Sequence, residues 1–295
     1  MTKTTKIALG SIAVGALVLG LKYAAFLYTG SIALYSDALE SIVNVASSIA
    51  TLAAVWFAQR PADSNHPYGH DKAEYFGAVV VGVMIVVTAL SIFREAWLSF
   101  QSPVNIANSP LGLGLNGVAS VINGFWAYLV IRTGRQDGSP ALVADGKHLV
   151  TDVVSSVGVL IGVFLVIVTG IQKLDSILAF LVGINILWSG WHLVKESVGG
   201  LMDEAVEPQL LSMIRELISE HAEGALEAHD LKTRHSGRAV FMEFHLVVPG
   251  SMTVDEAHTI CDRIEEAIKE KISGARITIH VEPDHEAEHR GIVVL

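Results

Sequence analysis

Six long runs of apolar residues, separated by short polar connections, occupy the first two thirds of the chain. They fall at roughly 7–28, 31–58, 76–98, 111–132, 142–170 and 174–196. A helix needs about 20 mainly apolar residues to cross a bilayer, and each run reaches that length. We therefore expect residues 1–202 to form a membrane all-α, six-helix transmembrane domain, with a longer loop at 59–75 between the second and third spans.

The pattern changes to that of a water-soluble domain after about residue 200. Helical spacing of apolar residues covers 207–221 and 253–272, and strand patterns cover 225–234, 239–248 and 275–281. The second helix opens on Thr253 with Glu256 three positions later, which is a capping-box signature. This order predicts an α+β ferredoxin-like (αββαβ) C-terminal domain over 203–283, followed by a flexible tail at 284–295.

The formal charge is unevenly divided between the two parts. Residues 1–200 contain 11 Lys+Arg and 11 Asp+Glu, whereas residues 201–295 contain 9 and 19, together with eight of the 12 histidines. An acidic, histidine-rich domain favours cations as partners and argues against nucleic acid. The one cysteine, Cys261, excludes a thiolate metal cluster and an intrachain disulfide.

Basic residues are asymmetrically placed around the expected spans. One side carries Lys3, Lys6, Arg60, Lys72, Arg132 and Arg135, and the other carries mainly Arg94 and Lys173. By the positive-inside rule, both termini are cytoplasmic in a multi-pass protein of the cell (inner) membrane, whose spans contact membrane lipids. The second and fifth spans then run in opposite directions.

The second and fifth spans carry the same polar spacing. In each, a carboxylate is followed by polar groups three and seven positions later and then by a Ser-Ser pair. These residues are Asp37, Glu40, Asn44, Ser47 and Ser48 in the second span and Asp145, His148, Asp152, Ser155 and Ser156 in the fifth. Positions i, i+3 and i+7 share one stripe of a helix. Because the spans are antiparallel, the stripes are inverted copies, a recurring plan of transporters. Asp37 would lie toward the outer mouth and Asp145 toward the cytoplasmic mouth.

Ionisable groups inside a bilayer are costly, and they usually face an ion, a partner or a water path. Glu40, Asn44, His148 and Asp152 offer three oxygens and one imidazole nitrogen, a four-coordinate set suited to Zn²⁺ or a similar ion. Hydrogen bonding between helices is the alternative explanation. Neutral imidazole binds metal and imidazolium does not, so His148 would let protons compete with the metal.

The loop between the second and third spans has an Asp-x-x-His-x-x-x-His spacing at Asp63, His66 and His70. Carboxylate and imidazole ligands this close together are consistent with a second metal site at the cytoplasmic interface. On spacing alone, polar loop residues that hold no ligand explain the pattern equally well.

Three strings in the chain are highly specific. They are Y-T-G-S-I-A-L-Y-S-D-A-L-E-S-I-V-N, R-P-A-D-S-N-H-P-Y-G-H-D-K-A-E and A-D-G-K-H-L-V-T-D. Over nearly the whole length, the chain resembles the cation diffusion facilitator family of divalent metal/proton antiporters. The resemblance implies a homodimer that exports a divalent cation from the cytosol in exchange for protons and that is not an enzyme. It also implies that the two residue sets above are the transport site and a loop metal site.

The resemblance implies further residues in the C-terminal domain. A metal cluster near a dimer interface would be formed by His229, His245, His258, His280 and Glu282, with Asp230 orienting the ligands. Without the resemblance, these histidines would be taken as exposed or structural. An ion pair between Lys72 and Asp203 would tie the entrance of the third span to the C-terminal domain, and two solvated charges are the alternative.

The chain departs from zinc-transporting members of that family at two ligands. Glu40 stands where Asp or His is usual, and Asn44 stands where Asp is usual, so the site has one formal negative charge fewer. The remaining groups still suit Zn²⁺, the favoured cargo, or Fe²⁺, Co²⁺, Ni²⁺ or Cd²⁺ better than Mg²⁺ or Ca²⁺. A membrane-embedded metalloenzyme and a metal sensor without transport stay open as other functional classes.

Overall fold

The computed structural model describes residues 2–29, 32–102, 110–169, 171, 173–288 and 292–293. The chain divides into two compact units, Met1–Val198 and Gly199–Leu295. We call them the helical unit and the C-terminal unit.

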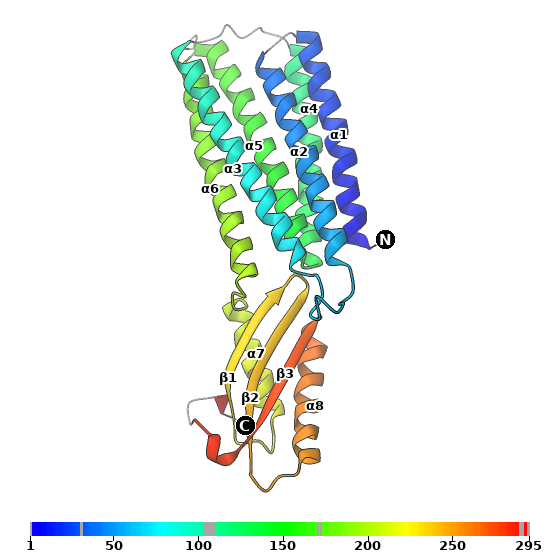
Figure 1. Cartoon of the computed structure of the whole chain (residues 1–295). Helices are drawn as coiled ribbons and strands as arrows, with labels where there is room; N and C mark the ends of the chain where they lie inside the picture. Colours follow the sequence, from blue (N-terminus) through cyan, green and yellow to red (C-terminus); the bar gives the residue numbers. More distant parts are fainter. Residues whose placement is uncertain are drawn as a thin grey trace. The chain divides into compact units, whose positions relative to one another are not determined.

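Six long helices make up the helical unit (Figure 1). They are α1 (Lys3–Thr29), α2 (Ile32–Ala58), α3 (Ala73–Gln101), α4 (Pro110–Gln136), α5 (Pro140–Thr169) and α6 (Lys173–Leu201). Each coincides with one of the apolar runs. Four described segments are long and apolar enough to cross a membrane: Lys3–Tyr28, Glu40–Ala58, Ala73–Gln101 and Leu113–Gln136. Several side chains of α5 and α6 lie outside the described part, so the count of six spans stays a prediction.

Small residues let neighbouring helices approach closely. A Cβ atom on Gly134 of α4 would lie 2.9 Å from the backbone nitrogen of Val143 on α5, so the two helices pack almost backbone to backbone there. Leu142 and Leu149 fill the adjoining core and are fully buried. Large apolar side chains such as Phe125 point outward, as expected for a surface that faces lipid.

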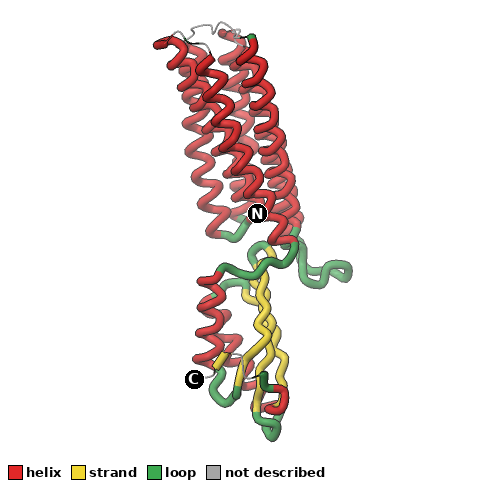
Figure 2. The backbone as a smooth tube through the Cα atoms, turned by 90° about the vertical axis from the view of Figure 1, so that its left-hand side faces the viewer, coloured by secondary structure: helices red, strands yellow, loops and turns green. Residues whose placement is uncertain are grey.

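The C-terminal unit follows the predicted αββαβ order. Its elements are α7 (Pro208–His221), β1 (Glu227–Ser236), β2 (Ala239–Val248), α8 (Val254–Lys271) and β3 (Ala275–Pro283). The sheet order is β3-β2-β1-β4, with β2 antiparallel to β1 and parallel to β3. Figure 2 shows both helices on one face of the strands, so the other face is open.

Alternation along β2 decides which side chains reach each face. Met242, Phe244 and Leu246 are buried under the helices, whereas Glu243 and His245 between them point to the open face. Polar and metal-binding side chains can therefore gather only on the open face.

The predicted capping box begins α8. The Thr253 hydroxyl accepts a hydrogen bond from the Glu256 N–H, and the Glu256 carboxylate accepts one from the Thr253 N–H at 2.8 Å. Together these bonds satisfy two N–H groups that the helix itself leaves unpaired.

Ile264 of α8 is fully buried in the core of the C-terminal unit. An Ile264→Val substitution removes one methyl group, and we expect the free energy of unfolding of this unit to fall by about 1 kcal/mol. Amide hydrogen exchange of the full-length protein should accelerate in α8 and β2 and stay unchanged in α1–α5. Val254→Ala is the control, because Val254 lies on the same helix and is 88% exposed. Equal acceleration in the two variants would contradict the assignment of this core.

The tail contains two short elements among its described residues. Asp284–Glu286 form a short 3₁₀ helix, and β4 (Ile292–Val293) pairs antiparallel with Glu227 and Ala228 of β1. Two β-branched residues favour a strand, but so short a run gives no recognisable period.

Candidate functional site

The two polar stripes lie on helices that pack against each other. α2 and α5 are neighbours and run in opposite directions (Figure 1), as the sequence predicts. Asp145 connects them, because its Oδ1 atom accepts hydrogen bonds from Ser48 Oγ at 3.0 Å and Ser47 Oγ at 3.4 Å. The carboxylate of one stripe thus meets the Ser-Ser pair of the other. The side chain of Asp37, its counterpart, lies outside the described residues.

Asn44 and His148 are buried in the middle of these stripes, each with 1% of its surface exposed. Both amide atoms of Asn44 and both ring nitrogens of His148 lack a hydrogen-bond partner among the described residues. Glu40, one turn before Asn44, is half-buried. Buried polar atoms normally find a partner, so a bound ligand is one way to satisfy each of these atoms.

Asp152 has two partners that the stripe pattern does not indicate. The Nζ atom of Lys22 on α1 lies 3.0 Å from each carboxylate oxygen, and Asn123 on α4 donates a 2.7 Å hydrogen bond to Oδ2. The Lys22 and Asp152 side chains are 0% and 1% exposed. A lysine within an apolar run was the one sequence signal for this contact, since a charge at that depth needs a partner.

The predicted transport ligands do not by themselves close into a metal centre. Among the described histidine, cysteine and carboxylate side chains, two groups bring three ligand atoms within 4.8 Å of one another: Asp63, His66 and His70, and His229, His245 and Glu282. Glu40, His148 and Asp152 form no third group. The Asp152 carboxylate is instead occupied by Lys22 and Asn123.

The loop between α2 and α3 brings its three predicted ligands together. Asp63 Oδ1 lies 3.3 Å from His66 Nδ1, and Asp63 Oδ2 lies 3.4 Å from His70 Nε2. The backbone N–H groups of His66 and Asn65 donate to Asp63 Oδ1 and lower the pKa of this carboxyl. Asp63 therefore stays ionised at neutral pH, and one carboxylate with two imidazoles suits a zinc-like ion.

Three histidines form a row across the open face of the C-terminal sheet. The register places His229 of β1 opposite His245 of β2, and His245 opposite His280 of β3. Neighbouring ring centroids are 5.2 Å and 5.0 Å apart. Glu282 lies two residues beyond His280 on the same face. Its carboxylate oxygens reach His245 Nδ1 at 2.9 Å and His229 Nε2 at 3.2 Å.

Some polar atoms of the histidine row also lack a hydrogen-bond partner among the described residues. His229 Nδ1 and Glu282 Oε2 are buried and have no hydrogen-bond partner in the described part of the chain. Glu227 Oε1 lies 3.4 Å from that Nδ1, but without the geometry of a hydrogen bond. An ion between the imidazoles and the Glu282 carboxylate would satisfy Glu282 Oε2, which lies on the Nε2 side of the His229 ring, and would leave Nδ1 facing Glu227.

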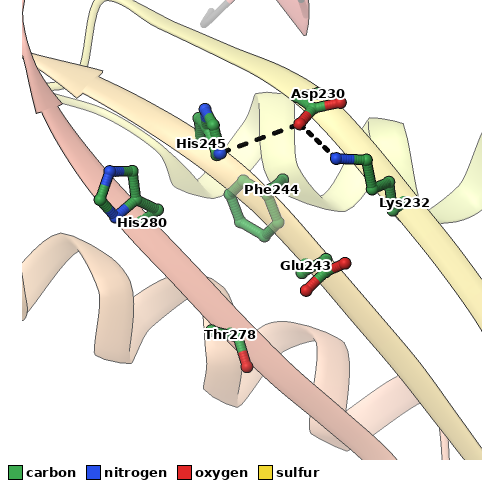
Figure 3. A pocket seen from close by; sticks show the side chains of 7 residues that line it. All are labelled: Asp230, Lys232, Glu243, Phe244, His245, Thr278 and His280. Atoms are coloured by element: carbon green, nitrogen blue, oxygen red, sulfur yellow. Dashed lines mark hydrogen bonds and ion pairs between the residues drawn. The ribbon is translucent and has the colours of Figure 1, made fainter.

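Asp230 lies at the edge of the row (Figure 3). Its Oδ2 atom is 3.8 Å from His245 Nε2 and accepts a 2.6 Å hydrogen bond from Lys232, which lowers the pKa of Asp230. Together with His280 these side chains line a pocket of about 160 Å³. A bulge in β1 sets this position, because the register shifts between His229 and Lys232 and Asp230 has a φ of 50°.

His258, the fifth implied ligand, does not join the row of its own chain. It lies on α8, its side chain is 72% exposed, and its Nε2 atom is 3.7 Å from Asp262. α8 covers the face of the sheet opposite to the row. Within the C-terminal unit, Asp203 pairs with Arg234 at 3.1 Å. A pair between Asp203 and Lys72 would join the two units and stays a prediction.

The tail carries H-E-A-E-H at 285–289, a metalloprotease spacing that is not among the candidate sites above. That motif needs an α-helix to bring its two histidines onto one face. Here His285 belongs to a three-residue 3₁₀ helix and lies near Asp284 and Glu286, and His289 is outside the described residues. The described geometry therefore does not support a protease site.

Known proteins match the chain along most of its length. The family model of the cation efflux transmembrane domain matches residues 8–202, and that of the cation efflux protein cytoplasmic domain matches residues 206–284. An uncharacterized transporter of Synechocystis sp., sll1263, is 43% identical over 92% of this chain and 88% of that protein. The cation-efflux pump FieF of Yersinia pestis is 30% identical over 94% of this chain and 91% of that protein. A solved chain of the transporter CzrB in a Zn form is 47% identical, covers 29% of this chain and 98% of that chain, and has a TM-score of 0.28.

Apolar helices with buried polar stripes, followed by a small αββαβ domain, define a multi-pass membrane transporter. The chain belongs to the cation diffusion facilitator family of cation efflux transporters. Members of this family bind divalent metals, and the family is one of transporters and not of enzymes.

Proposed function

We propose that this chain is a homodimeric secondary transporter that exports a divalent transition-metal cation from the cytosol in exchange for protons. Zn²⁺ is the favoured cargo, and Fe²⁺, Co²⁺, Ni²⁺ and Cd²⁺ suit the same ligands. The proposal rests on two buried side chains of neighbouring helices, Asn44 and His148. Their polar atoms have no hydrogen-bond partner among the described residues. Asp152, one turn beyond His148, supplies the anionic ligand.

Proton coupling rests on the imidazole of His148. A neutral imidazole binds a metal through a ring nitrogen, whereas a protonated one offers only N–H donors, so a proton from the outside displaces the ion. Asn44 does not titrate and carries no proton. The substitution of the usual aspartate by Asn44 therefore removes the negative charge that the site would carry whenever that aspartate is ionised.

The loop site and the histidine row act on the cytoplasmic side. Both termini are cytoplasmic in the cell (inner) membrane, and the loop site would meet metal at the entrance. The histidine row of the C-terminal unit binds cytosolic metal and stiffens the dimer, which favours the transport-competent state. Because His258 lies away from the row of its own chain, it joins a row only if the second copy presents it.

Metal flux into sealed liposomes tests the proposal. The full-length protein is reconstituted, and Zn²⁺ uptake is followed with a trapped indicator at equal pH and with an acidic lumen. We expect the acidic lumen to accelerate uptake, because protons leave as metal enters. A sensor or a metalloenzyme would give no flux, and flux indifferent to the pH gradient would refute proton coupling. A metal panel on the wild type and Asn44→Asp would show which cargo the neutral amide favours.

A further inference from the structure

A fully buried lysine on α1, Lys22, has no part in the transport site as assigned so far. Lys22 Nζ lies 3.0 Å from Asp152 Oδ1, 3.0 Å from Asp152 Oδ2 and 3.5 Å from Ser156 Oγ. Its side chain is 0% exposed. An ammonium group placed symmetrically across both oxygens occupies the position from which a metal would approach the carboxylate.

Charge balance at this depth determines what the contact does. A lone carboxylate inside a bilayer is costly, and Lys22 neutralises Asp152 as long as no other cation is present. A dication bound to the same carboxylate would lie a few ångströms from the ammonium. In a low-dielectric interior, the repulsion between these two cations is large compared with thermal energy. The Asp152 carboxylate can therefore neutralise either the Lys22 ammonium or the metal ion at close range, but not both at once.

We propose that Lys22 is a tethered counter-cation that holds Asp152 when the transport site is empty and is displaced from it when the metal binds. The inference rests on the proposed function for the identity of the site. Ser156, one turn beyond Asp152 on α5, offers the displaced ammonium an oxygen acceptor that it already touches. Asn123 keeps its hydrogen bond to Oδ2 and preserves the orientation of the carboxylate during the exchange.

Two consequences follow for transport. Competition from Lys22 weakens metal binding at Asp152, which helps the ion leave on the far side. Asp152 also stays electrically balanced when no metal is bound, so this carboxylate adds no uncompensated charge to the bilayer when the unloaded transporter returns. Lys22 is thus a positioning residue that acts on the metal through Asp152.

Zinc binding to the full-length protein in nanodiscs tests the displacement. Titration calorimetry with Zn²⁺ compares the wild type with Lys22→Met. The membrane site is identified as the part of the zinc binding that is lost in Asp152→Asn. We expect Lys22→Met to tighten that component by about tenfold or more, because the competing cation is gone. Lys22→Arg, which keeps the charge, is the matched control and should bind zinc within a few-fold of wild type. Unchanged or weaker binding in Lys22→Met would overturn the proposal.

Thermal stability without metal gives a second readout. Lys22→Met leaves Asp152 uncompensated, so we expect a lower Tm that is partly restored in the double variant with Asp152→Asn. Added Zn²⁺ should raise the Tm of Lys22→Met by more than that of wild type. Lys22→Gln replaces Lys22→Met if the latter does not fold. Equal Tm values for the single and double variants would contradict the pairing. Absence of flux in the wild type would refute the proposed function while leaving these comparisons valid.

Discussion

Replacing Asp152 with alanine is expected to reduce metal flux into sealed liposomes to the level of protein-free vesicles. The substitution removes the anionic ligand of the proposed transport site. It also leaves the Lys22 ammonium buried without its carboxylate, and breaking a buried ion pair in this way costs about 3–5 kcal/mol. A lower Tm should therefore accompany the loss of flux, whereas the dimer should persist in cross-linking, because the C-terminal unit is untouched.

Thr151→Ala is the matched control for this experiment. Thr151 precedes Asp152 on α5, and its hydroxyl donates a 3.0 Å hydrogen bond to the Lys147 carbonyl of its own helix. Its removal leaves the facing stripes intact, so flux should stay close to wild type. Asp152→Asn, which keeps the side-chain shape, separates loss of charge from loss of packing. Full flux in either Asp152 variant would place the transport site elsewhere.

Glu282→Gln is expected to weaken zinc binding by the C-terminal histidine row by about a hundredfold or more. Loss of an outer partner of a metal site already costs 10–100-fold, and Glu282 here contacts two imidazoles directly, at 2.9 Å and 3.2 Å. The substitution keeps the volume and removes the charge that balances the ion. Competition with a chromophoric chelator on the full-length protein would measure the change.

Glu286→Gln provides the comparison for the Glu282 experiment. Glu286 lies in the 3₁₀ helix just after β3. Its side chain is largely exposed and lies 3.7 Å from His285. Its neutralisation changes the net charge by the same amount without reaching the histidine row. Equal losses of affinity in the two variants would show that overall charge, and not the row, attracts the metal.

The secondary structure of both units was predictable because its signals are local. The apolar runs give α1–α6, since a membrane span needs only length and low polarity. The αββαβ order follows from changes of period between 3.6 and 2, and the capping box fixes the start of α8. The short β4 strand was not predictable, because two residues carry no period.

The candidate sites were predictable in composition but only partly in geometry. The loop ligands come together because Asp63 and His70 are separated by one tight turn. The Lys22–Asp152 pair joins residues 130 positions apart, and nothing in local spacing indicates it. The position of His258 on the covered face became clear only when the sheet showed which face α8 occupies. Side-chain type therefore identified candidates, and long-range packing decided which of them meet.

The bulge at Asp230 makes the alternation of β1 change phase within the strand. Before it, His229 points to the open face. After it, Lys232 and Arg234 point to that same face although they lie an odd number of residues away. A deletion of this extra residue would leave a regular ladder, in which His229 and Lys232 keep their partners His245 and Glu243 and stay on the open face. The core under the helices would therefore persist, but the position that places Asp230 beside His245 would be lost. The extra residue thus adds a carboxylate to the rim of the histidine row at no cost to the inside–outside order of the strand.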